Sequence, residues 1–479
     1  MQGNKFKVLL IYPNCMMMNL LPSSIASLSA YLKHNGIEVE LFDTTFYQTE
    51  EESFDDKKVK LLQVKPFDLG VEIKSEKEMY EDLMGMVNDY KPDLIGISLV
   101  EDTIPLGLKL LESVREYDCP VIAGGVGITF SPELLQEEDV DFICMGEGEE
   151  VFVDLVRHIQ KGLVWFGLGL RPLIDINTLP FLDFDIFGED RLKRPMHGAI
   201  KRMIHIEVDR GCPYSCSYCA ADKLKGMYGS KYYRRKTPDR VIAELYHLKL
   251  KHNPDYVDIN SETFLARPYE DLKGLLTRYR KMIGIPYWCQ GRPETFSEEK
   301  IKLLKATGCS DTQMGIEHGN EEFRRKYLHR NMTNETILKS CHLLEEYKLP
   351  YSVNNIIGWP DETRELVFDT VNLNKQINPK THNCYMMTPY KGSWIYDYCV
   401  SEGLLEVGSR TQQALTGSDI KYRYMTKEEF LGIQRCFSIY AKMGHIYMGS
   451  TIARAEKFSD FGNKMFNLLS EEYREKYYS

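Results

Sequence analysis

Three closely spaced cysteines, Cys212, Cys216 and Cys219, are the residues of this sequence with the clearest potential for chemistry. They lie in the segment Gly-Cys-Pro-Tyr-Ser-Cys-Ser-Tyr-Cys, and no fourth cysteine follows at ligand spacing. Cuboidal iron–sulfur clusters normally use four thiolates, often from one short segment. Three thiolates on one loop would leave one iron free to bind another molecule. A zinc site, which usually needs a second ligand pair, and three unrelated core thiols are the alternatives.

The Cys-x3-Cys-x-aromatic-x-Cys spacing, with Tyr218 as the aromatic residue, resembles the signature of the radical S-adenosylmethionine (SAM) enzymes. This resemblance implies a [4Fe–4S] cluster whose fourth iron chelates the amino and carboxylate groups of SAM. It also implies reductive cleavage of SAM to a 5′-deoxyadenosyl radical, a cofactor reaction that the protein orients and shields. The surrounding sequence agrees, because residues 205–208 predict a short strand and Thr237-Pro238 begins a helix.

Predicted strands and helices alternate from about residue 200 to about residue 385. Such a succession indicates a parallel barrel, complete or partial, with functional residues at the C-terminal ends of the strands. The resemblance implies a partial, TIM-like (β/α)6 barrel, and the number of predicted strands agrees. The predicted strands are residues 205–208, 256–260, 287–290, 311–315, 351–357 and 382–387, and the predicted helices are 269–283, 297–306, 334–347 and 363–376.

Polar residues at these strand ends are the predicted SAM contacts. By resemblance to the family, Glu262 meets the SAM amino group and Glu317, in a Gly-x-Glu segment, accepts hydrogen bonds from the ribose. Arg292 pairs with the SAM carboxylate, since a guanidinium matches that planar anion. Tyr218 and Ile357, the latter in an Ile-Ile-Gly-Trp-Pro segment, flank the adenine. For each residue, a capping or surface ion-pair role is the alternative. His318 is either a proton carrier or a hydrogen-bonded bystander.

The first part of the chain has the pattern of an α/β domain with a doubly wound parallel sheet. Residues 48–75 are acidic, rich in lysine and unpatterned, so they predict a surface insertion. Open sheets of this kind bind ligands outside the C-terminal ends of their strands. The predicted strands are residues 7–12, 38–43, 92–100, 121–125 and 141–144, and the predicted helices are 23–32, 78–90 and 105–116.

In combination, this pattern resembles the Rossmann-like cobalamin-binding domain that precedes many radical SAM barrels. The glycine pair Gly124-Gly125 would let a bulky ligand approach the backbone, although turn chemistry is the simpler explanation. The Asp-x-His-x-x-Gly loop of histidine-ligated cobalamin domains is absent, and residues 14–19 read Asn-Cys-Met-Met-Met-Asn instead. The resemblance therefore implies a cobalt whose lower face is not held by histidine from that loop. The candidate cobalamin contacts are Asn14, Ser98, Gly124, Gly125 and Glu147.

Composition narrows the class of protein. The net charge of −10 gives no support to nucleic-acid binding, and no run of about 18 apolar residues predicts a membrane span. The first residues have too short an apolar core for a signal peptide. Twelve scattered cysteines fit a reducing compartment, so we expect a cytoplasmic protein.

These observations predict a cobalamin-dependent radical SAM enzyme, most simply a C-methyltransferase acting on a small-molecule or natural-product substrate. Radical cyclisation or ring rearrangement without methyl transfer is the first alternative, and a non-catalytic corrinoid-binding protein is the second. An external reductant such as flavodoxin or ferredoxin is the expected partner, and no general acid or base can be assigned. The predicted organisation is a B12-binding domain at 1–160, a linker at 161–200, a radical SAM core at 201–392 and a mostly helical C-terminal region at 393–479.

Overall fold

The structure, a computed structural model, describes residues 5–135, 140–165, 167, 169–196, 198–409, 414–447 and 449–478. The chain divides into two compact units, which are described separately below. Among the described residues, no helix is long and apolar enough to cross a membrane. Unit 1 comprises residues 1–54 and 68–194, and unit 2 comprises residues 55–67 and 195–479.

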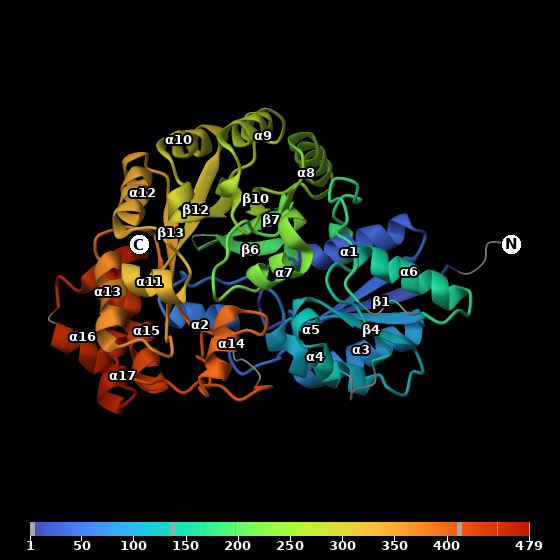
Figure 1. Cartoon of the computed structure of the whole chain (residues 1–479), viewed down its shortest axis with the longest axis horizontal. Helices are drawn as coiled ribbons and strands as arrows, with labels where there is room; N and C mark the ends of the chain where they lie inside the picture. The colour runs from blue at the N-terminus through green and yellow to red at the C-terminus, as the bar shows by residue number, and fades with distance from the viewer. Residues whose placement is uncertain are drawn as a thin grey trace. The chain divides into compact units, whose positions relative to one another are not determined.

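Unit 1 is built on a five-stranded parallel sheet, of which Figure 1 labels β1 and β4, and the strand order is β2-β1-β3-β4-β5. In such an order the chain reverses direction across the sheet between β1 and β3, which is where doubly wound folds bind ligands. The predicted doubly wound sheet is therefore confirmed. Its strands are β1 (Lys7–Tyr12), β2 (Glu38–Asp43), β3 (Leu94–Ser98), β4 (Val121–Gly124) and β5 (Phe142–Ile143).

Helices cover both faces of this sheet. Buried side chains of α3 and α4, such as Leu83 and Leu110, share one apolar cluster with Ile95 of β3. On the opposite face Phe152 of α6 lies directly over Gly96, where a Cβ atom would approach its ring to 2.6 Å. The helices of unit 1 are α1 (Ser23–His34), α3 (Glu76–Tyr90), α4 (Ile104–Ser113), α5 (Val126–Phe130) and α6 (Glu149–Gln160).

The C-terminal part of unit 1 packs against α1. Ile174, Ile176 and Leu179 form a small apolar cluster with Tyr31 of that helix. Asp183 accepts hydrogen bonds from Ser29 Oγ at 2.7 Å and from Lys33 Nζ at 2.6 Å. Ile174, Ile176, Leu179 and Asp183 fall inside the segment predicted as a linker, residues 161–200, and all four lie in unit 1.

Unit 2 contains a seven-stranded sheet with the order β14-β13-β12-β11-β10-β7-β6. From β7 to β14 every neighbouring pair is parallel, so consecutive strands of the predicted barrel lie side by side. The predicted partial barrel is confirmed. Its strands are β6 (Lys193–Met196), β7 (Ala199–Glu207), β10 (Tyr256–Asn260), β11 (Tyr287–Gly291), β12 (Cys309–Glu317), β13 (Tyr351–Ile357) and β14 (His382–Met386), and a separate hairpin pairs β8 (Asp209–Arg210) with β9 (Arg234–Arg235).

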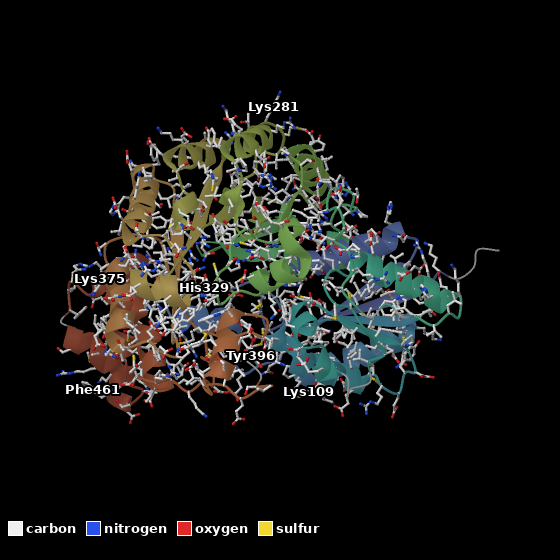
Figure 2. All side chains as sticks on the ribbon, viewed as in Figure 1. Lys109, Lys281, His329, Lys375, Tyr396 and Phe461 are labelled. Atoms are coloured by element: carbon white, nitrogen blue, oxygen red, sulfur yellow. The ribbon has the colours of Figure 1, made fainter. Side chains whose placement is uncertain are left out.

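Four of the crossover helices of this barrel, α8, α10, α12 and α13, begin at a side-chain cap. Thr237, Ser297, Thr333 and Thr363 accept hydrogen bonds from backbone N–H groups in the first turns of their helices. In α8, α9 and α10, basic residues such as Lys281 lie in the last turn, where they interact favourably with the helix dipole (Figure 2). The helices are α7 (Ala220–Tyr228), α8 (Pro238–His252), α9 (Tyr269–Met282), α10 (Glu298–Thr307), α11 (Glu321–Tyr327), α12 (Asn334–Glu346) and α13 (Arg364–Asn374).

The end of the chain is helical, as predicted, and its central helix α15 packs against β14 and α13. The apolar cluster formed by α13, α15 and β14 also includes the fully buried Leu62. Next to it, Gln63 Nε2 donates to the Cys384 carbonyl at 2.8 Å. The prediction that residues 48–75 form a surface insertion is therefore wrong for this part. The helices are α2 (Phe54–Lys60), α14 (Trp394–Ser401), α15 (Lys427–Met443), α16 (Gly449–Ala455) and α17 (Asp460–Tyr477).

Candidate active site

The cysteine loop leaves the barrel at the C-terminal end of β7 and ends at the first residue of α7. Gly211 opens the loop with a φ of +84°, and a Cβ atom there would lie 2.7 Å from the Tyr232 carbonyl oxygen. Any other residue would be strained at this position. Glycine therefore lets the chain turn sharply into the segment that carries the three thiols.

Ser217, between the second and third cysteines, fixes the back of the loop. Its N–H donates to the Leu328 carbonyl at 3.2 Å, and its hydroxyl donates to the Tyr327 carbonyl. Its own carbonyl accepts from the N–H of Ile395 at 3.1 Å. All three cysteines are free of disulfides and are partly exposed as residues.

The thiols are a chemically suitable donor set for an iron–sulfur cluster. Burial, with a smaller contribution from the charge of Glu262, raises the pKa of Cys212 to about 11 and that of Cys219 to about 12. A bound metal supplies the nearby positive charge that stabilises the thiolate form of these cysteines. Among the described residues, no three His, Cys, Asp or Glu side chains converge on a single metal-ion position.

Arg292, which follows β11, contacts the cysteine loop directly. Its Nη1 donates to Cys216 Sγ at 3.3 Å, and its Nε donates to Glu294 Oε1 at 2.7 Å. The guanidinium carbon also lies 3.8 Å from the centre of the Tyr214 ring, which is a cation–π distance. The structure thus brings this predicted SAM contact to the thiols themselves.

Glu317, at the end of β12, lies in a buried polar group with Arg330 and Tyr218. Arg330 Nη1 donates to Glu317 Oε1 at 3.2 Å and to Tyr218 Oη at 3.0 Å. Burial raises the pKa of Glu317, and the charge of Arg330 opposes that rise. Burial likewise raises the pKa of Tyr218. Two of the predicted SAM contacts are therefore held by one arginine.

The backbone around Glu317 is built to place its carboxylate. Glu317 has a φ of +68°, an uncommon conformation for a residue with a side chain, and the β12–β13 register shifts beside it. Its carboxylate folds back over Gly315, where a Cβ atom would come within 2.0 Å of Glu317 Oε1. The Gly-x-Glu spacing therefore has a steric cause.

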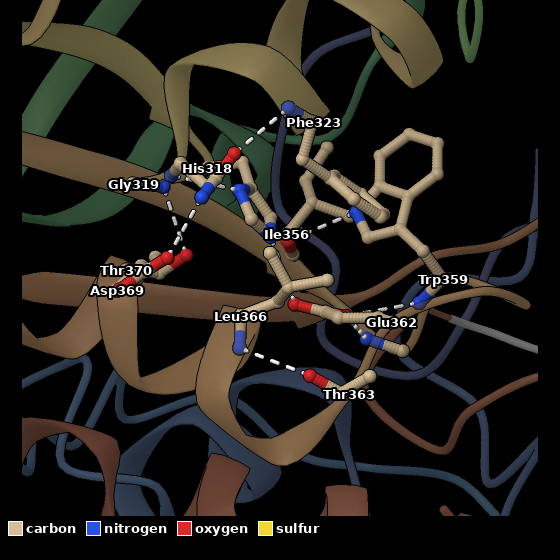
Figure 3. A network of polar contacts seen from close by, with 12 residues as sticks. His318, Gly319, Phe323, Ile356, Trp359, Glu362, Thr363, Leu366, Asp369 and Thr370 are labelled. Atoms are coloured by element: carbon tan, nitrogen blue, oxygen red, sulfur yellow. Dashed lines mark hydrogen bonds and ion pairs between the residues drawn. The ribbon is translucent and has the colours of Figure 1, made fainter. Parts of the chain in front are cut away.

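His318 and Glu362 form a buried pair that joins the ends of β12 and β13 (Figure 3). His318 Nδ1 accepts from the N–H of Asn320 at 3.1 Å, so Nε2 carries the proton that faces Glu362 Oε1 at 3.0 Å. Glu362 Oε2 accepts from the N–H groups of Gly358 and Trp359 at 2.7 and 3.1 Å. The pair fixes the loop after β13. The contacts of His318 are those of a hydrogen-bonded structural residue, the second of the two roles considered for it.

Glu262 and Ile357 are placed differently from the buried residues above. Glu262 follows β10 and is exposed, yet the atoms crowded around its carboxylate raise its pKa. Ile357 points its side chain into the apolar cluster shared with α13 and α15. Its neighbour Ile356 packs instead in the cluster that contains Tyr218. Any ligand contact by Ile357 must therefore use its backbone.

A second buried charge group lies under the start of the cysteine loop. Arg267 is fully buried and donates to the Val208 carbonyl at 2.6 Å, and its Nε lies 3.6 Å from Asp209 Oδ2. Ser261 Oγ donates to Asp209 Oδ1 at 2.6 Å. Burial raises the pKa of Asp209 to about 6 despite these partners. The group ties the end of β7 to the loop that carries Glu262.

In unit 1 the predicted cobalamin contacts follow adjacent parallel strands and so share one edge of the sheet. Asn14 is buried, and its Nδ2 donates to the Met18 carbonyl at 2.8 Å and to Thr45 Oγ1 at 2.7 Å. Its side chain therefore shapes the loop of residues 14–18, in which Met17 has a φ of +63°.

Gly124, the last residue of β4, faces Cys144, and Gly125 packs against the loop that follows Ser98, the last residue of β3. Gly125 has a φ of +101°, and a Cβ atom there would lie 2.4 Å from the Leu99 carbonyl oxygen. The chain itself thus requires glycine at this position. Glu147, beyond β5, accepts a hydrogen bond from the N–H of Ile174 at 3.3 Å.

A cavity of about 470 Å³ in unit 1 lies beside the end of β2. A buried ion pair borders it, with Arg191 Nε 2.8 Å from Asp43 Oδ2. Phe187 and Tyr47 supply apolar walls. The cavity contains none of the predicted cobalamin contacts.

Sequence reasoning missed three residues that organise the site, Arg330, Glu362 and Glu294. None of them terminates a strand, and strand ends were the signal used. Arg330 follows α11 in the basic segment Arg-Arg-Lys-Tyr-Leu-His-Arg, where its burial is not visible from charge alone. Glu362 follows Gly-Trp-Pro-Asp, a turn sequence whose free N–H groups could have indicated an acidic partner.

Two family models match this chain. One, described as the B12 binding domain, matches residues 15–156. The other, described as the radical SAM superfamily, matches residues 206–373 and spans the cysteine loop and strands β10 to β13.

Individual relatives agree with these matches. An uncharacterized methyltransferase from Pyrococcus horikoshii is 25% identical over 384 residues, which is 75% of this chain and 81% of the relative. The radical SAM methyltransferase TsrM from Kitasatospora setae has a TM-score of 0.62 at 18% identity, over 83% of this chain and 75% of TsrM. The cobalamin-dependent radical SAM enzyme OxsB has a TM-score of 0.67 at 15% identity, over 99% and 72%. The two solved structures support the fold.

Proposed function

We propose that this chain, which belongs to the cobalamin-dependent radical SAM enzymes, transfers a methyl group to an unactivated carbon of a small-molecule or natural-product substrate. One observation carries the proposal. Three thiols lie on one loop at the C-terminal end of a parallel barrel sheet, and charged groups from the neighbouring strand ends surround them. The methyltransferase relative supports methyl transfer as the outcome.

Cys212, Cys216 and Cys219 would hold a [4Fe–4S] cluster with one iron open to SAM. When bound, the cluster and SAM supply a hydrogen-abstracting radical and cobalamin supplies the methyl group. The chain contributes rigid placement, because the bonds to Ser217 fix the loop and the Arg267 group fixes its base. Such preorganisation keeps a reactive species aligned with its target.

The charged strand ends are suited to the polar parts of SAM. We assign the SAM amino group to Glu262, the carboxylate to Arg292 and the ribose hydroxyls to Glu317. Tyr218 and the backbone of Ile357 would flank the adenine. Glu317 suits this role, because Arg330 positions its carboxylate.

We assign cobalamin to the edge of the unit 1 sheet that carries Asn14, Ser98, Gly124, Gly125 and Glu147. The loop after β1 has methionines where related domains have a histidine ligand, with Met16 buried and Met17 and Met18 partly exposed. We therefore expect the lower face of the cobalt to lack a histidine from this loop.

An external one-electron reductant such as flavodoxin or ferredoxin completes the proposal. The twelve cysteines, all within the described residues, are free thiols. Together with an oxygen-sensitive cluster, they would require a reducing compartment, and we propose the cytoplasm.

Anaerobic reconstitution tests the proposal in three stages. We expect about four irons per chain, dithionite-dependent cleavage of SAM and a corrinoid spectrum after purification with cobalamin. A variant with all three cysteines changed to alanine is expected to lose cluster and cleavage, while Cys119→Ser, which changes a partly buried thiol of unit 1, keeps both. SAM cleavage by the triple variant would contradict the proposal.

Product mass then separates the two enzymatic alternatives. Methylation adds the mass of one CH2 to the substrate, whereas cyclisation or rearrangement adds no carbon. A product without added carbon would leave the radical chemistry standing and remove methyl transfer.

A further inference from the structure

We propose that Arg292 raises the reduction potential of the iron–sulfur cluster by donating a hydrogen bond to the sulfur of Cys216. The inference rests on the proposed function, because it assumes a cluster on Cys212, Cys216 and Cys219. It adds a role that is separate from binding SAM, since the hydrogen bond runs to a cysteine sulfur of the loop.

Three contacts hold the guanidinium in place. Its Nη1 lies 3.3 Å from Cys216 Sγ, its Nε lies 2.7 Å from Glu294 Oε1 and its carbon lies 3.8 Å from the Tyr214 ring centre. The Arg292 side chain is 11% exposed. A side chain held by three contacts has little conformational freedom left, so we expect the hydrogen bond to the sulfur to persist when the cluster is bound.

The sign of the effect follows from charge. Reduction adds one negative charge to the cluster, and part of that charge resides on its cysteine sulfurs. A cationic donor at hydrogen-bond distance stabilises the more negative, reduced form, and hydrogen bonds to the sulfurs are a known means of setting cluster potentials. Low exposure limits screening of this interaction by salt. Arg292 therefore makes the first electron easier to accept.

Glu294 moderates the effect. Its carboxylate is 28% exposed and bonds to the opposite side of the same guanidinium. The negative charge of Glu294 thus reduces the electrostatic effect of Arg292 on the sulfur of Cys216. Nη2 has no hydrogen-bond partner among the described residues, so one arginine can contact Cys216 and a SAM carboxylate together.

The test compares the midpoint potential of the reconstituted cluster in the full chain and in three variants, without SAM, by redox titration followed with electron paramagnetic resonance. Arg292→Met removes the charge and the donor at similar length, and Arg292→Lys keeps the charge without the forked geometry. Glu294→Gln removes the opposing carboxylate. Iron content and the visible spectrum confirm that each sample holds the same cluster.

We expect Arg292→Met to lower the potential by at least a tenfold change in the reduction equilibrium, which is about 59 mV for a one-electron couple. Arg292→Lys is expected to lower it less, and Glu294→Gln to raise it. If Arg292→Met does not retain a cluster, the opposite shifts of the other two variants decide the question.

An unchanged potential in Arg292→Met, or shifts of the same sign in Arg292→Lys and Glu294→Gln, would overturn the inference and leave the proposed function intact. Absence of a four-iron cluster from the unmodified chain would overturn both. The two failures are therefore distinguishable.

Discussion

The strand ends of the two units hold their polar side chains in different ways. In unit 2, Glu317 and Arg330 form a buried ion pair at the C-terminal edge of the barrel sheet. In unit 1, the ends of β1 and β4 carry the neutral residues Asn14 and Gly124, and the Asn14 amide is bonded to its own and the neighbouring loop. The candidate SAM contacts are thus organised by charge, whereas Asn14 and Gly124 are organised by backbone shape, although Glu147 and the Asp43–Arg191 pair place charge at other strand ends of unit 1.

This difference separates two modes of recognition. A buried charge needs a partner of opposite charge, which holds it in one position. Charges held in this way bind a charged ligand in a single orientation. Neutral contacts built from loops discriminate instead by their fit to the surface of the ligand. We infer that the edge of unit 2 is suited to SAM, with its charged amino acid end, and that of unit 1 to a large corrin ring.

The largest expected effect is removal of the Glu362 carboxylate from the charged edge. Glu362→Ala leaves His318 and the N–H groups of Gly358 and Trp359 without their acceptor in a fully buried place. We expect the free energy of unfolding of unit 2 to fall by about 3–5 kcal/mol. Urea unfolding followed by tryptophan fluorescence measures it, since three of the four tryptophans lie in unit 2.

The matched control for this change is Glu365→Ala. Glu365 is exposed in the first turn of α13, so its loss is expected to cost about 1 kcal/mol or less. Equal destabilisation by both variants would show that Glu362 is an ordinary helix-end acid and that the charged edge has no special rigidity.

A second prediction uses pH to test whether the charges of unit 2 are held at a cost. The folded pKa of Asp209 is about 6, above its ordinary value of 3.8, so the folded chain binds a proton that the unfolded chain has released. Its contribution to the free energy of unfolding is therefore present below about pH 4 and lost as the pH rises through about 6. The rise in pKa corresponds to about 3 kcal/mol.

Asp209→Asn checks this sign. We expect the difference in unfolding free energy between the cluster-free variant and the unmodified chain to change with pH over that interval, with the variant gaining relative stability as the pH rises. The same measurement on Asp239→Asn, which alters an exposed acid of α8, is expected to show no such trend. A flat difference for Asp209→Asn would mean that its carboxylate is well solvated.

A pair of glycines tests whether the two edges act independently. In Gly315→Ala the new Cβ atom would displace the Glu317 carboxylate, and in Gly125→Ala it would strike the Leu99 carbonyl. We expect each change to cost about 1–3 kcal/mol in folding. Gly315→Ala is expected to weaken SAM binding by about tenfold or more without affecting corrinoid binding, and Gly125→Ala to do the reverse.

Calorimetric titration of SAM and spectroscopic titration of cobalamin on both variants give the comparison. Loss of both ligands in either variant would contradict separate recognition by the two edges. Gly85→Ala, in a helix with open space around it, provides the control.

The sequence was sufficient to predict both sheets because local patterns encode them. β1 and β2 were predicted at the bounds that the structure shows, since each is a short run ended by turn residues. The segment around Leu62 was not, because its burial depends on contacts with β14 and α15 that lie more than 300 residues away in sequence. Periodicity contains no information about such contacts.

The site divides in the same way. Glu317 was predicted from a Gly-x-Glu spacing whose cause is local, the approach of its carboxylate to Gly315. Arg330 and Glu362 were missed because each acts across the fold, on Tyr218 from 112 positions away and on His318 from 44. Partners of this kind emerge only when the strand ends are assembled.

The smallest effect is expected at an ion pair outside both edges. Lys74 and Asp82 of unit 1 lie 2.7 Å apart, but their side chains are 46% and 39% exposed. Water and salt screen such pairs, so Lys74→Met is expected to change the free energy of unfolding by less than about 1 kcal/mol. Lys236→Met in unit 2, which breaks a pair with Glu244 that is 2% and 0% exposed, is expected to cost several times more. Urea unfolding at low and high salt separates the two pairs, because only the exposed pair is expected to respond to salt. A similar loss of unfolding free energy in both variants would mean that burial does not distinguish the ion pairs of the two units.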